Sequence, residues 1–217
     1  MMTTLCGTLF VFQGQELGMR NFSMEWSPDE YKDIESVNYW KKMQSMYPND
    51  QKHQDYARRV LQRKARDHSR TPIPWTPEPP NAGFCPSGVK PWMRVNDDYP
   101  KINVETETKK SGQDLSIFQF WTQEIEIRKK HKETLVYGDF ELIGDDSEDS
   151  PVFAYVRKSR DENWIVILNF SGKDIQWRLP DDVKVTQWIV NNYSGKPEKV
   201  LGGELVLRPW EGLQGML

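Results

Sequence analysis

The sequence predicts an α/β region followed by an all-β domain. Three observations support this prediction: a continuous apolar run near the amino terminus, helical periodicity within the first 130 residues, and a series of short strands after residue 135 that no helix interrupts. At 217 residues with 37% hydrophobic content, the chain is long enough for one large domain or two small ones with packed cores.

Residues 7–12 (GTLFVF) form an apolar run that does not alternate with polar side chains. This pattern is typical of a strand that is buried on both faces of a parallel sheet. The polar segment at residues 13–16 then ends the strand. Because such a strand needs parallel neighbours and no strand precedes this one, we expect the chain to begin in the middle of a fold.

Two helices are expected between residues 27 and 70. The first begins at Ser27, an N-cap residue that is followed by Pro28 and two acids. The second spans about residues 50–67, with Tyr56, Val60 and Leu61 directed inward. Its outward side chains are basic and are expected to form a solvated face rather than a binding patch: Arg58, Arg59, Arg63 and Lys64.

Residues 70–104 hold most of the prolines in the chain, so this stretch can be neither a helix nor a central strand. Two Trp and one Phe within it favour a packed loop over a flexible linker. Ordered loops of this length usually carry function. We therefore expect a functional loop here.

Residues 114–130 show the most regular helical pattern, and one face carries Ile117, Phe120, Trp121, Ile125 and Arg128. Short runs separated by turn residues follow this helix. They predict six strands, at residues 136–143, 152–158, 164–170, 175–179, 183–190 and 204–208. Strands without intervening helices predict an antiparallel sandwich of about 80 residues.

The composition excludes several classes of partner. The 29 basic and 32 acidic residues give a net charge of −3 without a basic stripe, which argues against nucleic acid. The apolar run near the amino terminus lacks a basic flank and is too short to span a bilayer, so no membrane partner is expected. Cys6 and Cys85 form neither a disulfide framework nor a metal site, which favours a reducing, cytoplasmic setting.

Two side chains stand out as candidates for chemistry. Glu16 follows the carboxyl end of the expected parallel strand, where barrel enzymes place their sites, but a lone carboxylate there more often accepts bonds from turn amides. Arg70 opens the proline-rich loop, where its guanidinium could bind ligand oxygens or form a surface salt bridge.

Several segments, taken in order, resemble one enzyme family. Residues 7–19 (GTLFVFQGQELGM) closely resemble the eighth barrel strand and following turn of fungal-type maltases and oligo-1,6-glucosidases in the α-amylase superfamily, glycoside hydrolase family 13. Residues 69–75 (SRTPIPW) resemble the S-R-T-P-M-Q-W segment of that family, with Ile73 and Pro74 as departures. Further matches follow in the same order: Asn81-Ala82-Gly83-Phe84, Lys90-Pro91-Trp92, Val95-Asn96, Ile102-Asn103-Val104-Glu105 and Leu207-Arg208-Pro209-Trp210-Glu211-Gly212.

The resemblance implies the last strand and helices of a (β/α)8 TIM barrel over residues 1–134, and an antiparallel β-sandwich domain over residues 135–217. It implies that the complete enzyme is an α-glucosidase, which hydrolyses terminal α-linked glucose from oligosaccharides of the maltose or isomaltose type with retention. Such hydrolysis needs a nucleophilic Asp and an acid/base Glu. Their family motifs match no segment here, so no catalytic residue is assigned and the chain alone is expected to be inactive.

By the same resemblance, Arg70 corresponds to the arginine at the glucose-binding end of the family's pocket. Gln13 and Glu16 correspond to the rim beneath it, and Asn81 and Phe84 to the loop near its mouth. No cofactor or metal is implied. The alternative is a non-catalytic carbohydrate-binding or interaction module derived from such an enzyme.

Overall fold

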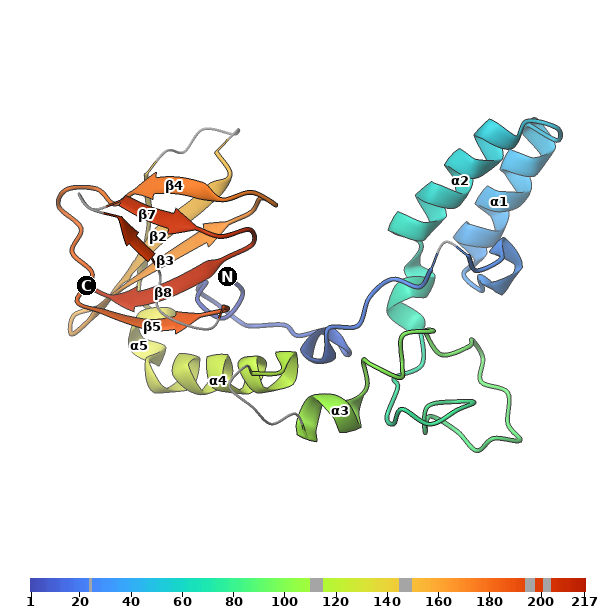
Figure 1. Ribbon diagram of the computed structural model, residues 1–217, viewed down its shortest axis with the longest axis horizontal. Coiled ribbons are helices and arrows are strands. Elements are labelled where there is room, and N and C mark those ends of the chain that lie inside the picture. Colours follow the sequence, from blue (N-terminus) through green and yellow to red (C-terminus); the bar gives the residue numbers. More distant parts are fainter. Residues whose placement is uncertain (24, 110–114, 145–149, 194–197, 201–203) are drawn as a thin grey trace. The chain divides into compact units, whose positions relative to one another are not determined.

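The computed structural model describes residues 1–23, 25–109, 115–144, 150–193, 198–200 and 204–217 (Figure 1). Close contacts between Cα atoms divide the chain into two compact units. The β unit contains residues 1–10, 115 and 119–217, and the helical unit contains residues 11–109 and 116–118, in each case as far as they are described.

The helical unit is built on a pair of helices, α1 (Ile34–Met46) and α2 (Gln51–Lys64). Side-chain caps begin both helices: Asp33 accepts a bond from the backbone N–H of Glu35, and Asp50 accepts one from His53. The other helical elements are three 3-10 turns and one short α-helix: Gln15–Leu17, Pro28–Glu30, Arg66–Arg70 and α3 (Val104–Lys109). Residues 71–103 contain no helix or strand, as the prolines predict.

The core of the helical unit is aromatic. Phe22 stacks on Trp26, with ring centroids 4.3 Å apart, and Trp40 and Leu61 are buried with them. The inward position predicted for Tyr56 is wrong, because its side chain is 56% exposed. Ala57 and Leu61, one turn apart, face the core instead. Tyr56 lies about 100° around the helix from Ala57 and therefore points to solvent.

Residues 7–12 do not form the buried strand that their composition predicts. The structure assigns them no sheet partner (Figure 1). The side chains of Phe10, Val11 and Phe12 are exposed. A strand is defined by hydrogen bonds to a neighbour, so an apolar composition alone cannot form one.

The β unit consists of two antiparallel sheets and two helices, α4 (Ile117–Lys130) and α5 (Lys132–Leu135), with only Gln119 onward of α4 belonging to this unit. The predicted start of α4 at Asp114 lies outside the described residues. The larger sheet has the order β1-β2-β3-β8-β5 and the smaller one β4-β7-β6. The strands are β1 (Asp139–Ile143), β2 (Val152–Lys158), β3 (Asn163–Asn169), β4 (Ile175–Arg178), β5 (Gln187–Asn191), β6 (Glu198–Val200), β7 (Glu204–Leu207) and β8 (Gly212–Met216).

The two sheets share one apolar core. Ile165 and Ile167 of β3 are fully buried and pack in one cluster with Leu205 and Leu207 of β7. Such side chains from the inner faces of two sheets are the defining contact of a sandwich. The predicted fold class is therefore confirmed for the all-β part.

Two strands, β6 and β8, were not predicted. β8 lies between β3 and β5 and is central to the larger sheet. Its sequence, GLQGM, contains two glycines and reads as a turn. Gly215 is nevertheless required there, because a Cβ atom at this position would lie 2.9 Å from the carbonyl oxygen of Gln187.

A buried arginine joins the amino-terminal residues to the rest of the β unit. The Nη1 atom of Arg128 donates to the carbonyl oxygens of Thr3 and Leu5 at 2.7 and 2.8 Å, and its Nη2 atom donates to Gly7 at 2.6 Å. Arg128 thereby holds residues 3–7 against α4. No helix in the described part of the chain is long and apolar enough to cross a bilayer.

Candidate functional site

The five candidate residues suggested by the sequence all lie in the helical unit: Gln13, Glu16, Arg70, Asn81 and Phe84. Arg70 is the last residue of the 3-10 turn that follows α2. Its Nη1 atom lies 2.6 Å from Oδ2 of Asp33, and 54% of its side chain is exposed. A guanidinium carries five N–H donors in a rigid fork, so an ion pair with one carboxylate oxygen does not exhaust it. The salt bridge and a ligand role are therefore compatible.

Asp33 is the partner that fixes Arg70. Its side chain is only 6% exposed. A hydrogen bond from the backbone N–H of Glu35 is the largest cause that lowers the pKa of Asp33, and the nearby charge of Arg70 lowers it further. Asp33 therefore stays ionised and holds the guanidinium at the start of α1.

Asp67 holds the segment that precedes α1 and the first turn of that helix in place. It is buried, and its Oδ1 atom accepts bonds from the backbone N–H groups of Lys32 and Asp33 at 2.6 and 2.9 Å. Its Oδ2 atom accepts a bond from the hydroxyl of Ser36 at 2.8 Å. The position of Asp33 before the apolar helix pattern was a sequence signal for its cap role, but nothing in the sequence pairs it with Arg70 or Asp67.

The proline-rich loop packs against Arg70 through one tryptophan. Trp92 donates from Nε1 to the carbonyl oxygen of Arg70 at 2.9 Å, and its ring meets Phe84 edge-on at 5.1 Å between centroids. Asn81 shapes the loop by donating to the carbonyl oxygens of Pro86 and Val89 at 3.0 and 2.9 Å. Phe84 is thus connected to Arg70 through Trp92, whereas Asn81 contributes to the loop's own geometry.

Gln13 and Glu16 lie in a different part of the unit. Gln13 lines a cavity of about 440 Å³ together with His68, Ser69 and Thr71, the residues on either side of Arg70. Glu16 lies in the 3-10 turn Gln15–Leu17 and does not line this cavity. The structure therefore brings Gln13 close to the Arg70 segment and leaves Glu16 apart from it.

His68 is a polar residue of this cavity that the sequence did not single out. Its Nε2 atom lies 3.0 Å from the carbonyl oxygen of Leu61, and its buried Nδ1 atom has no hydrogen-bond partner. Burial lowers the pKa of His68, so the ring is neutral near pH 7. Its ring also packs on Phe22 at 4.2 Å, which makes it part of the aromatic core.

The arrangement around Arg70 can bind oxygen atoms through the guanidinium N–H groups that Asp33 leaves free. Asp33 and Asp67, the buried carboxylates of this unit among the described residues, are both engaged by a cap, backbone amides or an ion pair. Retaining hydrolysis requires two carboxylates that face the substrate. In the described part of the chain, no cluster of three or more His, Cys, Asp or Glu side chains could hold a metal ion.

Comparisons with known proteins place these features in a family. The model for the α-amylase catalytic domain matches residues 1–138, and the model for the C-terminal domain of the α-amylase SusG matches residues 152–213. An α-glucosidase of Saccharomyces cerevisiae is 37% identical over 96% of this chain, and an oligo-1,6-glucosidase of the same yeast is 34% identical over 98%. These alignments cover 34% and 35% of the two relatives, so the chain spans about a third of their length.

A solved structure gives the same assignment. Trehalose-6-phosphate hydrolase of Bacillus licheniformis matches 99% of this chain with a TM-score of 0.83 and 31% sequence identity, over 36% of its own chain. The family resemblance in the sequence is therefore confirmed by independent comparisons of sequence and structure. The chain belongs to the α-amylase family of glycoside hydrolases, with part of the catalytic domain followed by a C-terminal β domain.

Proposed function

We propose that this chain is the C-terminal portion of an α-glucosidase, which removes terminal α-linked glucose from oligosaccharides by a retaining mechanism. In this proposal residues 1–134 complete the catalytic barrel and residues 135–217 form its sandwich domain. The α-glucosidase relatives support it, since one of them is 37% identical over 96% of the chain. Because the chain spans about a third of that relative, the activity belongs to the complete enzyme, acting on maltose-type or isomaltose-type substrates in the cytoplasm.

The observation that carries the proposal is the presentation of Arg70. Asp33 fixes one edge of its guanidinium at 2.6 Å, while more than half of the side chain stays exposed. A positioned guanidinium with N–H groups to spare suits the hydroxyl oxygens of a sugar. Gln13 and Glu16 serve as rim residues in this proposal, and Asn81 and Phe84 shape the loop at the mouth.

The same proposal assigns no catalytic residue to this chain. A covalent glucosyl intermediate needs a nucleophile and a proton donor, and a lone arginine replaces neither. We therefore expect the isolated 217-residue chain to release no glucose from maltose or isomaltose, as measured by a coupled glucose assay. Release of glucose by the contaminant-free chain would contradict this part of the proposal.

A fusion tests the role of Arg70. The first two-thirds of the yeast α-glucosidase, joined to this chain at the aligned boundary, is expected to hydrolyse maltose. Arg70→Ala in that fusion should lower kcat/KM at least about a hundredfold, because binding at the glucose end positions the bond for cleavage. Arg66→Ala is the matched control, since Arg66 forms a surface pair with Glu35 at 3.4 Å and its side chain is 62% exposed.

Three outcomes separate the alternatives. Loss of turnover in Arg70→Ala, with an unchanged melting temperature and an active Arg66→Ala control, supports the ligand role. Unchanged turnover would mean that Arg70 is only a salt-bridge residue. A folded but inactive fusion would favour a non-catalytic binding or interaction module instead.

A further inference from the structure

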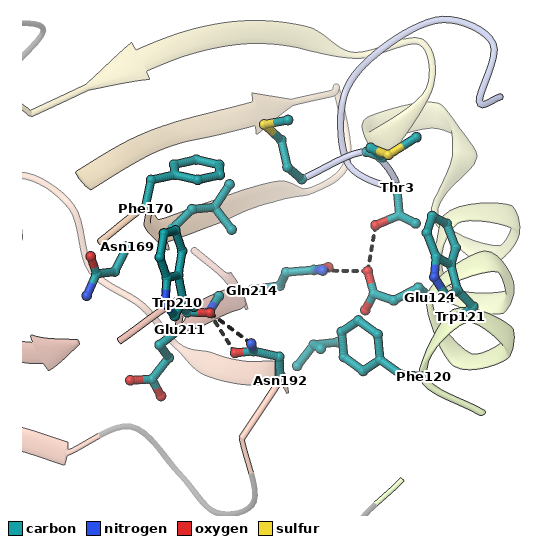
Figure 2. A pocket seen from close by; sticks show the side chains of 15 residues that line it. Thr3, Phe120, Trp121, Glu124, Asn169, Phe170, Asn192, Trp210, Glu211 and Gln214 are labelled. Atoms are coloured by element: carbon teal, nitrogen blue, oxygen red, sulfur yellow. Dashed lines mark hydrogen bonds between the residues drawn. The ribbon is translucent and has the colours of Figure 1, made fainter. Parts of the chain in front are cut away.

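Four carboxylates are buried in the described part of the chain: Asp33, Asp67, Glu124 and Glu211. The last two lie in the β unit and have bonding partners there. Glu124 lies at a cavity of about 310 Å³ near Trp210, and its Oε2 atom accepts bonds from Thr3 and Gln214 at 2.6 Å (Figure 2). Asp67 differs from them because its bonds lead to a candidate site residue.

Asp67 and Arg70 lie in the same 3-10 turn, Arg66–Arg70. The carboxylate of Asp67 reaches from this turn to the start of α1, where its Oδ1 atom accepts bonds from the backbone N–H groups of Lys32 and Asp33 at 2.6 and 2.9 Å. The side chain of Asp33 reaches back to the turn, since its Oδ2 atom lies 2.6 Å from Nη1 of Arg70. These bonds form a closed ring that contains both partners of the ion pair.

One ion pair does not hold a half-exposed arginine in a single orientation. The side chain of Arg70 is 54% exposed, and such pairs contribute little because water screens the charges and a long side chain must lose its freedom. The pair becomes directional only if its carboxylate is itself fixed. Asp33 is fixed twice, because Asp67 holds its backbone N–H and its Oδ1 atom accepts from the N–H of Glu35 at 2.9 Å.

Two further bonds hold the ring at its ends. The hydroxyl of Ser36, in the first turn of α1, donates to Oδ2 of Asp67 at 2.8 Å, so both oxygens of this carboxylate are bonded. Nε1 of Trp92 donates to the carbonyl oxygen of Arg70 at 2.9 Å. The backbone and the guanidinium of Arg70 are therefore held by different residues.

We propose that Asp67 is a positioning residue for Arg70. Asp67 sets the place of Asp33, and Asp33 sets the direction in which the remaining guanidinium N–H groups face a sugar. This inference rests on the ligand role proposed for Arg70 and adds that the role depends on a buried carboxylate of the same turn. Without Asp67, Arg70 would take several orientations, and a smaller fraction of the enzyme would bind the sugar productively.

The orientation of Arg70 can be measured on the 217-residue chain without any activity. In NMR spectra, a guanidinium that is held in an ion pair gives separate N–H signals, and the spectrum of Arg70→Ala identifies those of Arg70. We expect these signals to merge in Asp67→Ala. They should persist in Asp67→Asn, because the amide oxygen still accepts bonds from the two backbone N–H groups. Asp50→Ala is the matched control, since Asp50 caps α2 as Asp33 caps α1, and it should leave the signals unchanged.

The same variants in the active fusion separate positioning from stability. Asp67→Ala should lower kcat/KM at least about tenfold, and Asp67→Asn should restore most of that loss. When Arg70 is already alanine, Asp67→Ala should cost less than about twofold, because Asp67 acts through Arg70. Ser36→Ala removes one bond of the ring and leaves the buried carboxylate in place. It should lower kcat/KM about threefold, and it tests the ring even if Asp67→Ala does not fold.

Two results would overturn the inference. One is unchanged Arg70 signals in the folded Asp67→Ala and Ser36→Ala chains. The other is an equal loss of kcat/KM with and without Arg70, which is the sign of a purely structural role. Failure of the proposed ligand role gives a different result, because Arg70→Ala would then leave turnover unchanged while the signals of Arg70 still responded to Asp67→Ala.

Discussion

At the residue scale, several positions in the β unit are constrained by backbone atoms rather than by side-chain packing. Gly138 is the clearest case, because a Cβ atom there would lie 2.4 Å from the carbonyl oxygen of Lys158 and 2.5 Å from that of Thr134. The carbonyl of Gly138 also accepts a bond from the fully buried Arg157 at 2.7 Å. The sequence shows that Gly138 is a glycine, but only the structure shows which atoms exclude every other residue.

Gly138→Ala is expected to destabilise the β unit by about 2–3 kcal/mol, because the backbone atoms around the site cannot move apart cheaply. Gly172→Ala is the matched control, since the nearest atom to its Cβ would be Nε1 of Trp210 at 3.8 Å. We expect the control to change stability by less than about 0.5 kcal/mol. Chemical denaturation of the three proteins measures the difference. Equal stability of the two variants would show that the backbone at Gly138 can adjust.

Glu211 is a second constrained residue, and its charge makes stability depend on pH. Its side chain is fully buried. Burial raises the pKa of Glu211, but hydrogen bonds from the side chain and backbone of Arg208, and from Asn191, outweigh that effect and lower it overall. A carboxyl with a lowered pKa in the folded state contributes stability above the unfolded pKa of about 4.3. That contribution is lost as the pH falls through the folded pKa.

Glu211→Gln should therefore lower the free energy of unfolding by about 2 kcal/mol at pH 7. The difference from the parent protein should narrow as the pH falls below about 4, where the parent carboxyl becomes protonated too. Asp181→Asn is the control, because Asp181 pairs with Arg178 at the surface and its side chain is 88% exposed. Urea unfolding at pH 7, 5 and 3.5 measures both variants. If the free energies of unfolding of Glu211→Gln and the parent protein differed by the same amount at all three pH values, Glu211 would not be the source of the pH dependence.

At the scale of elements, the sequence predicted helices better than strand partners. The helix at 117–130 and the proline-rich loop follow from local patterns that need no distant partner. The prediction of a strand at residues 7–12 was wrong, because this segment has the composition of a strand but no partner. The strand β8 was missed for the opposite reason, because it has two partners but not the composition of a strand. Strand formation depends on residues far away in the sequence, so composition alone could not decide either case.

The site could be predicted only in part for a similar reason. Motif resemblance selected Arg70 and the loop that contains Phe84 as candidates, because both lie in contiguous segments. The ion pair with Asp33 joins residues 37 positions apart, and the cavity near Trp210 joins both ends of the chain. Such contacts leave no local pattern, so Asp33, His68 and Glu124 were not identified from the sequence.

The side chain of Arg128 attaches α4 to the first residues of the chain. Arg128→Met should destabilise the β unit by about 3 kcal/mol, because the carbonyl oxygens of Thr3, Leu5 and Gly7 would lose a charged donor. Lys129→Met changes the neighbouring, exposed residue of the same helix and should have little effect. Thermal unfolding compares the two. A similar melting temperature for both variants would show that water can bond the three carbonyl oxygens in place of the arginine without loss of stability.

At the scale of the whole molecule, stability should be distributed unevenly within the β unit. β3 and β8 are interior strands of the larger sheet, and residues 164–167 of β3 are fully buried. β1 and β5 are the two edges of that sheet. Interior strands open only when the sheet itself comes apart, whereas edges open locally.

Amide hydrogen exchange should therefore be slowest in β3 and β8 and at least about tenfold faster in β1 and β5. Mass spectrometry of peptides from the exchanged protein measures this order. Residues 8–12 should exchange fastest of these segments, because they have no strand partner in the structure. Equally slow exchange at the edges and in the centre would show that the sheet opens only as a unit.

The position of β8 also has a consequence for synthesis. Chains emerge from the ribosome at about 5–20 residues per second, so residues 212–216 appear after all the other strands of the larger sheet. The first three strands of this sheet, β1 to β3, can pair with one another as they emerge. The strand β5 cannot join them until β8 has been made, because β8 lies between β3 and β5. Until β8 emerges, the nascent chain therefore carries an unpaired edge on β3, and a chain that stops before residue 212 would lack the strand that joins β5 to β3.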